Sequence, residues 1–219
     1  KEVKPKLIIS ALLGNFNAQV EAHDKAIDYI KNKNCRILFL SSANVFDSFR
    51  HFPSYEYDKT LSESKYGHFK IKIENKLFRL LVGKYIIARL PMIFGLNAPR
   101  TLEIDEAVKK NKFIEVFPNT IINVNSDIRL SQQIHYLINK KKTGLYHLGS
   151  SDLISHHDFI KMIVEKRHFN PGIFKQVYTS NTIRYLATLP KINRLPNHLT
   201  PSYIDVINDL CLPEIRKQY

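Results

Sequence analysis

The stretch RILFLSSANVFD, residues 36–47, begins as a continuous apolar run and ends in hydroxyl and amide side chains. A run that is apolar on both faces is typical of a central strand in a parallel sheet, because helices cover both faces of such a sheet. Ligands bind at the carboxyl ends of strands in open α/β sheets, and this strand carries Ser41 and Ser42 there. We therefore predict a parallel sheet with a functional site beside these two serines.

Strand and helix patterns alternate on both sides of this stretch. Residues 7–13 form another buried apolar run, and residues 17–32 follow with apolar positions at helical spacing. After a loop, residues 60–82 predict a long helix and residues 85–90 a further strand. Strand–helix–strand order implies right-handed crossovers. The first part of the chain is therefore predicted to have an α/β fold, with helices flanking a parallel sheet.

The second half of the sequence is less regular and predicts a smaller α+β lobe. We place the boundary near residue 95. Residues 1–95 are expected to form the core, and residues 96–219 mainly the lobe, with some elements returning to the core. Helical patterns cover residues 101–111, 126–139, 157–165 and 202–210, and short strand patterns cover residues 113–117, 120–124, 144–149 and 174–178.

Composition and charge disfavour two classes of function. The 219 residues carry a formal net charge of +13, but the basic residues are dispersed, and the densest cluster is Lys140–Lys142. A nucleic-acid footprint requires clustered basic residues, so a nucleic-acid binder is the least favoured function considered. No apolar run reaches the length of about 18 residues that a membrane span needs, and no membrane partner is expected.

The cysteines and histidines do not indicate a metal site. Cys35 and Cys211 are far apart and form no CxxC pair, which fits a reducing compartment such as the cytoplasm. His156-His157-Asp158 is interpreted as the start of a helix rather than as a set of metal ligands.

Tyr66 and Lys70 form a YxxxK pair, the strongest candidate for chemistry in the sequence. Residues four apart share one face of a helix, and a nearby ammonium favours the phenolate and lowers the pKa of a tyrosine. Such a tyrosine can exchange a proton with a carbonyl or hydroxyl oxygen near neutral pH. Position selects this pair, because it lies inside the longest helical pattern and follows the strand that ends in Ser42. Three other pairs match the spacing, namely Tyr29/Lys33, Tyr55/Lys59 and Tyr136/Lys140.

Several segments, in matching order, resemble the extended short-chain dehydrogenases/reductases. The likeness is greatest to the dTDP-4-dehydrorhamnose reductases and to related sugar-nucleotide reductases or epimerases. The segments are FLSSANVFD (39–47), YGHFK (66–70) with Glu74 beyond it, ARLPMIFG (88–95) and GLYHLG (144–149). The resemblance spans most of the chain. It implies a Rossmann-like parallel sheet flanked by helices, with its N-terminal strands absent, and a substrate-binding lobe.

The resemblance also implies the reduction of a 4-keto nucleotide sugar with NADPH or NADH as cofactor. Tyr66 would protonate the substrate oxygen and Ser42 would form a hydrogen bond to it. Lys70 would lower the pKa of Tyr66 and bind the cofactor ribose. Five more residues are expected to make contacts: Ala11, Pro91 and Met92 with the cofactor, and Asn123 and Arg129 with the substrate diphosphate.

The sequence departs from this family at the dinucleotide site. None of its seven glycines belongs to a glycine-rich turn, the feature that lets a backbone approach the pyrophosphate. We expect an early βαβ segment of about 60 residues, the size of two such units, to be absent. The chain would then be a fragment with low activity by itself. The open sheet edge would be covered by the lost segment, a second copy or another partner chain.

Two alternatives to a reductase remain open at this point. One is a catalytically silent relative that acts as a regulatory or scaffolding subunit, since a fold does not by itself determine function. The other is a nucleotide-sugar epimerase, which differs from a reductase in recycling its bound NAD.

Overall fold

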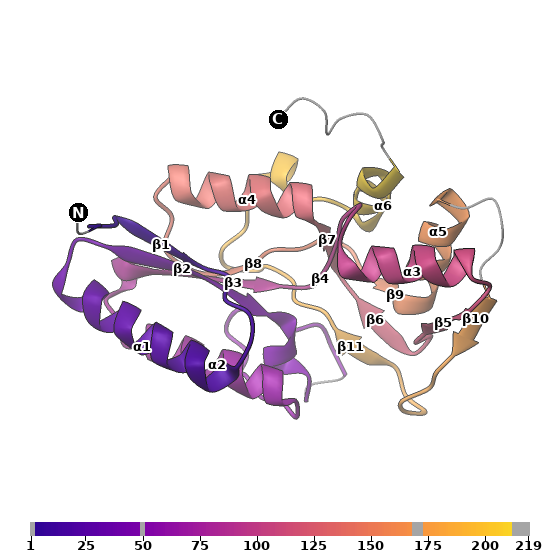
Figure 1. Ribbon diagram of the computed structural model, residues 1–219, viewed down its shortest axis with the longest axis horizontal. Helices are drawn as coiled ribbons and strands as arrows, with labels where there is room; N and C mark the ends of the chain where they lie inside the picture. The colour runs from indigo at the N-terminus through magenta and orange to yellow at the C-terminus, as the bar shows by residue number, and fades with distance from the viewer. Residues whose placement is uncertain (1–2, 49–50, 168–172, 212–219) are drawn as a thin grey trace.

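A four-stranded parallel sheet forms the centre of the computed structural model, which describes residues 3–48, 51–167 and 173–211 (Figure 1). The strand order is β1-β2-β3-β8, so β2 is central as the sequence predicts, whereas β1, predicted to be buried, is an edge strand. Their bounds are β1 Leu7–Ser10, β2 Arg36–Ser42, β3 Tyr85–Leu90 and β8 Gly144–His147. The expected α/β fold with a Rossmann-like parallel sheet is confirmed.

Helices cover both faces of this sheet, as Figure 1 shows. On one face, α1 (Phe16–Asn32) and α2 (Lys65–Leu77) bury Ile30 and Ile73 against Phe39 of β2. On the other face, α4 (Asp127–Asn139) buries Leu137 against Leu38 of the same strand. Successive side chains of a strand point to opposite faces, and this alternation explains why β2 is apolar throughout.

The remaining elements form a second lobe around a core of its own. Phe94, Ile122 and Phe159 are fully buried at its centre. Its helices are α3 (Pro99–Lys109), α5 (His156–Arg167) and α6 (Tyr203–Cys211). Its strands form three small sheets: β4 (Met92–Phe94) with β7 (Val124–Ser126); β5 (Phe113–Val116) with β10 (Ile173–Gln176); and β6 (Thr120–Ile122) with β11 (Arg184–Leu186) and β9 (Ile154–Ser155).

The described residues also include three short 3-10 turns: η1 (Ala43–Phe46), η2 (Val82–Lys84) and η3 (Asn197–Leu199). The largest error of the sequence prediction concerns α2, which is shorter than residues 60–82. The carboxylate of Asp47 accepts hydrogen bonds from the Glu63 amide and the Ser64 hydroxyl, and Ser64 then caps the helix at the Gly67 amide. These contacts hold the preceding residues outside the helix.

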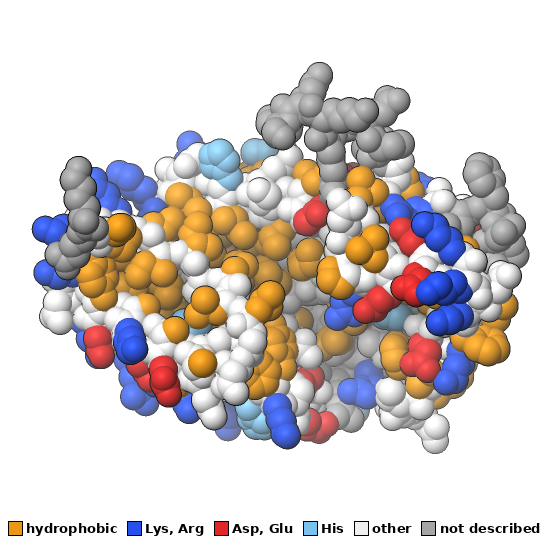
Figure 2. All heavy atoms as spheres, in the orientation of Figure 1, with side chains coloured by type: hydrophobic (Ala, Val, Ile, Leu, Met, Phe, Trp, Pro, Cys, Tyr) orange, Lys and Arg blue, Asp and Glu red, His pale blue; other side chains and the backbone are white. Residues whose placement is uncertain are grey.

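Strand β1 is one edge of the main sheet, and apolar side chains around it are exposed. Ile9 is 53% exposed, and Leu13, just beyond the strand, is 94% exposed. Figure 2 shows hydrophobic side chains gathered on this side of the molecule. The expected open apolar edge is therefore present. Among the described residues, no helix has the length and hydropathy needed to cross a membrane.

Candidate active site

Ser42, Tyr66 and Lys70 come together at the carboxyl ends of β2 and β3. Ser42 is the last residue of β2 and pairs with Leu90, the last residue of β3. Tyr66 lies in the first turn of α2, and its hydroxyl is hydrogen-bonded to Ser42. Both side chains line a cleft of about 470 Å³. The position at the ends of parallel strands is the one predicted from the sequence.

Gly67 is what allows Tyr66 to approach Ser42. A Cβ atom at Gly67 would lie 2.6 Å from Ser62 Cβ and even closer to the carbonyl oxygen of Asn44. The first turn of α2 therefore packs directly on the backbone that follows Ser42. A larger residue here would push the two catalytic candidates apart.

Lys70 lies one turn beyond Tyr66 and is almost fully buried. Its ammonium donates a hydrogen bond to the carbonyl oxygen of Leu40 at 2.7 Å and lies over the rings of Phe39, at 4.8 Å, and Tyr66, at 5.3 Å from the centroid. Burial lowers the pKa of Lys70 to about 8, against the opposing charge of Glu74. The side chain is thus a cation at neutral pH that loses its proton in mildly alkaline solution.

The pKa of Tyr66 differs from the expectation. Burial raises this pKa, and the hydrogen bond with Ser42 opposes the rise. The prediction that Lys70 holds the pKa of Tyr66 low is wrong for this structure, because the ammonium donates to Leu40 rather than to the phenol oxygen. Tyr66 is therefore a protonated phenol at neutral pH, in the state of an acid that can donate a proton.

The three residues expected to contact a cofactor lie at or near the cleft. Pro91 and Met92 follow Leu90, the last residue of β3, and line the same cleft as Tyr66. Ala11 directly follows β1 and is exposed at the same edge of the sheet. Between β1 and α1 the only glycine is Gly14, with φ of +100°. Within the described ranges no glycine-rich turn borders the cleft.

Asn123 and Arg129 do not join this site. Asn123 is fully buried, and its amide bonds both the N–H and the C=O of Thr188 at 3.1 and 2.8 Å. This burial contradicts the expectation of a substrate contact. Arg129 binds Asp209 through Nε at 2.7 Å and Nη2 at 3.2 Å. It ties α4 to α6 and does not line the cleft. Polar residues at strand and helix ends here serve the packing of the lobe.

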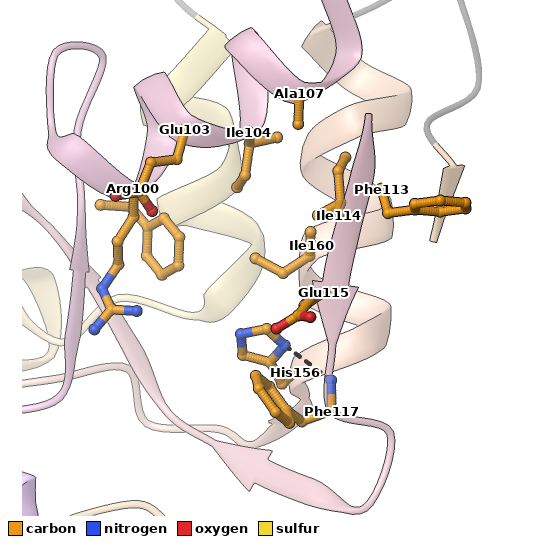
Figure 3. Close-up of a pocket in the computed structure, with 11 residues that line it drawn as sticks. Arg100, Glu103, Ile104, Ala107, Phe113, Ile114, Glu115, Phe117, His156 and Ile160 are labelled. Atoms are coloured by element: carbon orange, nitrogen blue, oxygen red, sulfur yellow. Dashed lines mark hydrogen bonds between the residues drawn. The ribbon is translucent and has the colours of Figure 1, made fainter. Parts of the chain in front are cut away.

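Arg100 is the residue that sequence reasoning missed. It lines the Tyr66 cleft and also a second pocket of about 280 Å³ between α3, β5 and α5, shown in Figure 3. Within the described part of the chain its guanidinium makes no hydrogen bond or ion pair, unlike Arg129. One feature of the sequence could have indicated Arg100. It follows Pro99 in the first turn of a helix, where a cation is unfavourable because the helix dipole is positive at that end.

The second pocket combines aliphatic walls with three phenylalanine rings and one imidazole, and the carboxylates of Glu103 and Glu115 also line it. Ile104 and Ile160 form part of its wall, and Phe117 lies edge-on to His156 with centroids 5.2 Å apart. His156 Nδ1 accepts a hydrogen bond from the Phe117 amide at 3.3 Å. Burial, first, and Arg100 lower the pKa of His156 to about 4. The ring is therefore neutral at pH 7, and its Nε2–H is left as a donor. His156 begins α5, as the sequence indicates.

Comparison with known proteins covers both the sheet and the lobe. The family model described as the RmlD substrate binding domain matches residues 14–198. A search of curated proteins found no match. The dTDP-4-dehydrorhamnose reductase of Yersinia enterocolitica is 21% identical, with a TM-score of 0.77 over 94% of this chain and 80% of that chain. The reductase of Bacillus anthracis, solved in complex with NADP, is 20% identical with a TM-score of 0.74 over the same shares of the two chains.

An epimerase shares the fold as well. The UDP-N-acetylglucosamine 4-epimerase of Bacillus cereus is 13% identical, with a TM-score of 0.69 over 94% of this chain and 76% of that chain. At such identities the likeness to solved structures concerns the fold. Together with the family match, it confirms the resemblance seen in the sequence.

Proposed function

Because the chain belongs to the RmlD substrate binding domain family, we propose that it binds a nucleotide sugar and serves the reduction of a keto group on that sugar, with NADPH or NADH as cofactor. The observation that carries the proposal is that Ser42 and Tyr66 line one cleft at the ends of β2 and β3, with the Lys70 ammonium 5.3 Å from the Tyr66 ring centroid. Solved relatives with this fold include a reductase in complex with NADP.

The geometry supports a division of labour among the three side chains. When bound, the reduced nicotinamide supplies the hydride for the keto carbon. Tyr66 donates its phenolic proton to the developing alkoxide, a transfer that its raised pKa permits because the phenol is protonated at neutral pH. Ser42 donates a hydrogen bond to the same oxygen once its hydroxyl turns from Asn44, which it now contacts at 3.0 Å.

Lys70 acts on the oxygen through electrostatics. Its ammonium is 5.3 Å from the Tyr66 ring centroid and lies in a site of low exposure, where a cation stabilises a phenolate left after proton transfer. We therefore propose that Lys70 binds the cofactor ribose, and that it stabilises the phenolate only when its ammonium turns from the Leu40 carbonyl towards the phenol during turnover.

Arg100 supports the nucleotide part of the proposal. It lies where the Tyr66 cleft meets the second pocket, and a free guanidinium suits the paired phosphates of a nucleotide sugar. The sugar would then face Tyr66, the diphosphate Arg100, and the base the pocket beside His156 and Phe117. We retain the 4-keto sugar as the specific substrate. We propose Ala11, Pro91 and Met92 as cofactor contacts, and replace Asn123 and Arg129 by Arg100 for the substrate.

Three further proposals concern organisation. We propose that residues 1–95 act as the partial Rossmann-like catalytic core and residues 96–219 mainly as the substrate lobe, with β8 and α4 returning to the core. The open β1 edge supports pairing with a second copy or another chain. The unpaired Cys35 and Cys211 support a cytoplasmic setting.

The test is the consumption of NADPH in the presence of dTDP-4-dehydrorhamnose, with Tyr66→Phe compared with Tyr136→Phe, a variant in another YxxxK pair. We expect Tyr66→Phe to reduce kcat by roughly 10²- to 10⁴-fold, the range for loss of a general acid, and Tyr136→Phe to leave it unchanged. Equal activity of the two variants would exclude Tyr66 as the proton donor. Binding of the sugar nucleotide without turnover would favour the silent relative, which the absence of a glycine-rich turn in the described ranges also suggests.

A further inference from the structure

A network of buried polar side chains lies directly behind the cleft. Arg89 of β3 is 2% exposed and Glu74 of α2 is 1% exposed. The carboxylate accepts from Arg89 Nε at 3.0 Å and from Nη2 at 2.7 Å, a bidentate pair. Ser41 of β2 donates to the same carboxylate at 2.5 Å. One ion pair therefore joins both central strands to the catalytic helix.

The network continues through His147 of β8. Arg89 Nη1 lies 3.3 Å from His147 Nε2, and His147 Nδ1 lies 3.1 Å from the carbonyl oxygen of Leu189. An arginine can only donate and a carbonyl can only accept. The imidazole is therefore neutral with its proton on Nδ1, and a single tautomer satisfies both neighbours. The pKa of His147 is lowered to about 4, first by burial and then by Arg89, which agrees with this state.

The far end of the network holds the chain segment that borders the cleft. Glu56 accepts hydrogen bonds from the amides of Lys191, Ile192 and Asn193 at 2.9 to 3.2 Å. Pro190 joins these residues to Leu189, and Leu186, three residues before Leu189, lines the same cleft as Tyr66. The contacts thus run from α2 to the Leu189 carbonyl, in a segment that also contributes Leu186 to the cleft.

Three members of the network lie close in sequence to residues of the proposed chemistry. Ser41 precedes Ser42, Glu74 lies one helical turn beyond Lys70, and Arg89 lies two residues before Pro91. A buried ion pair is in general weak evidence for stability, because desolvation offsets the attraction. A buried network whose polar groups have hydrogen-bond partners instead fixes one arrangement of the strands and the helix that carry the site.

On the premise of the reductase function proposed above, we infer that Glu74, Arg89 and His147 are positioning residues that hold Ser42, Tyr66 and Lys70 in register across α2, β2, β3 and β8. They do not touch the cleft, which none of the three lines. Their effect on the reaction is to fix where the phenol and ammonium lie. A displacement of about 1 Å at a reacting group can reduce turnover by roughly 100-fold.

Glu74→Gln is the principal test, because the amide keeps the shape of the side chain and removes its charge. We expect kcat for NADPH-dependent reduction of dTDP-4-dehydrorhamnose to fall by about 10- to 100-fold, with KM for the sugar nucleotide changed by less than about twofold. Arg167→Met is the matched control, since Arg167 forms a half-buried bidentate pair with Asp105 in the second lobe. It should lower stability and leave kcat of the folded protein unchanged.

A second measurement does not depend on activity. Glu74 raises the pKa of Lys70 through its charge, so titration of the Lys70 amine, followed by NMR after reductive ¹³C-methylation, should show a lower pKa in Glu74→Gln than in the parent. His147→Asn provides an independent variant, since its amide can still donate to Leu189 but no longer reaches Arg89. We expect it to lower kcat as Glu74→Gln does.

The results separate the two proposals. If the parent shows no turnover but the pKa of Lys70 falls in Glu74→Gln, the reductase function fails and the link between network and site stands. If kcat per folded molecule and the pKa of Lys70 are unchanged in Glu74→Gln, the network serves stability alone and the inference is overturned.

Discussion

Gly67→Ala is expected to destabilise the protein, although alanine is the better helix former. In an exposed helix this change stabilises by about 1 kcal/mol. Here the added methyl group would meet the carbonyl oxygen of Asn44 and the side chain of Ser62 well inside 3.0 Å. The backbone contact cannot rotate away, so α2 must shift, and overpacking of this kind costs about 1–3 kcal/mol. We expect a net loss of about 1–2 kcal/mol.

The loss is measurable by thermal unfolding. For a chain of this size 1 kcal/mol corresponds to about 2–4 °C in Tm, so Gly67→Ala should lower Tm by roughly 2–8 °C. Gly83→Ala is the control, because nothing lies within 4 Å of its added Cβ and its φ is not positive. It should leave Tm unchanged or raise it slightly. If Gly67→Ala is as stable as the parent, α2 does not pack on the backbone after Ser42 as described.

Three further outcomes follow from the same contacts. The unfolded chain binds a proton at Lys70 up to its ordinary pKa of 10.5, whereas the folded protein releases it near pH 8. The free energy of unfolding, measured with urea, should therefore rise between pH 8 and 10, by up to about 3 kcal/mol, and Lys70→Met should remove this rise. Asn123→Ala leaves the backbone of Thr188 without partners, and should cost about 2–3 kcal/mol in urea unfolding without a change in KM. Arg100→Met should raise KM for the nucleotide sugar by about 10- to 100-fold, the loss of a hydrogen bond to a charged group, while the exposed Lys109→Met on the same helix should not. A KM unchanged in Arg100→Met would place the diphosphate elsewhere.

Local patterns in the sequence were sufficient for the main sheet and for the residues at its carboxyl edge. The strands at residues 36–42 and 85–90 are apolar on both faces, and both are central in the structure. The Tyr66/Lys70 pair was selected by its position after β2, and Tyr66 does line the same cleft as Ser42. Such features depend on neighbours within a few residues or on one crossover, and these leave a periodic signal.

Features that depend on distant residues were missed or misassigned. Strands β4 and β11 have three residues each and exist because of their partners, so no periodicity marks them. Arg89 meets Glu74 and His147 across separations of 15 and 58 residues. Asn123 was expected at the substrate because it is polar and near a strand end, but its side chain points inward to Thr188. The direction of a polar side chain at such a place is set by tertiary packing.

The pKa of Tyr66 shows a similar limit. The YxxxK spacing places an ammonium on the same helix face as the phenol, and this was taken to lower the pKa of the tyrosine. Burial raises it instead, and Lys70 donates to the Leu40 carbonyl. Spacing along a helix indicates which groups are neighbours, but the strength of their coupling depends on the other partners that each group finds.

Transfer of deuterium from NADPH labelled at C4 of the nicotinamide ring to the sugar is the most direct test of the reductase function. The parent protein would be incubated with the labelled cofactor and dTDP-4-dehydrorhamnose, and the product analysed by mass spectrometry and NMR. We expect one deuterium at the former keto carbon, and its loss in Tyr66→Phe. A sugar nucleotide recovered unreduced and unlabelled from the parent, with bound NADPH intact, would contradict the function proposed for this cleft.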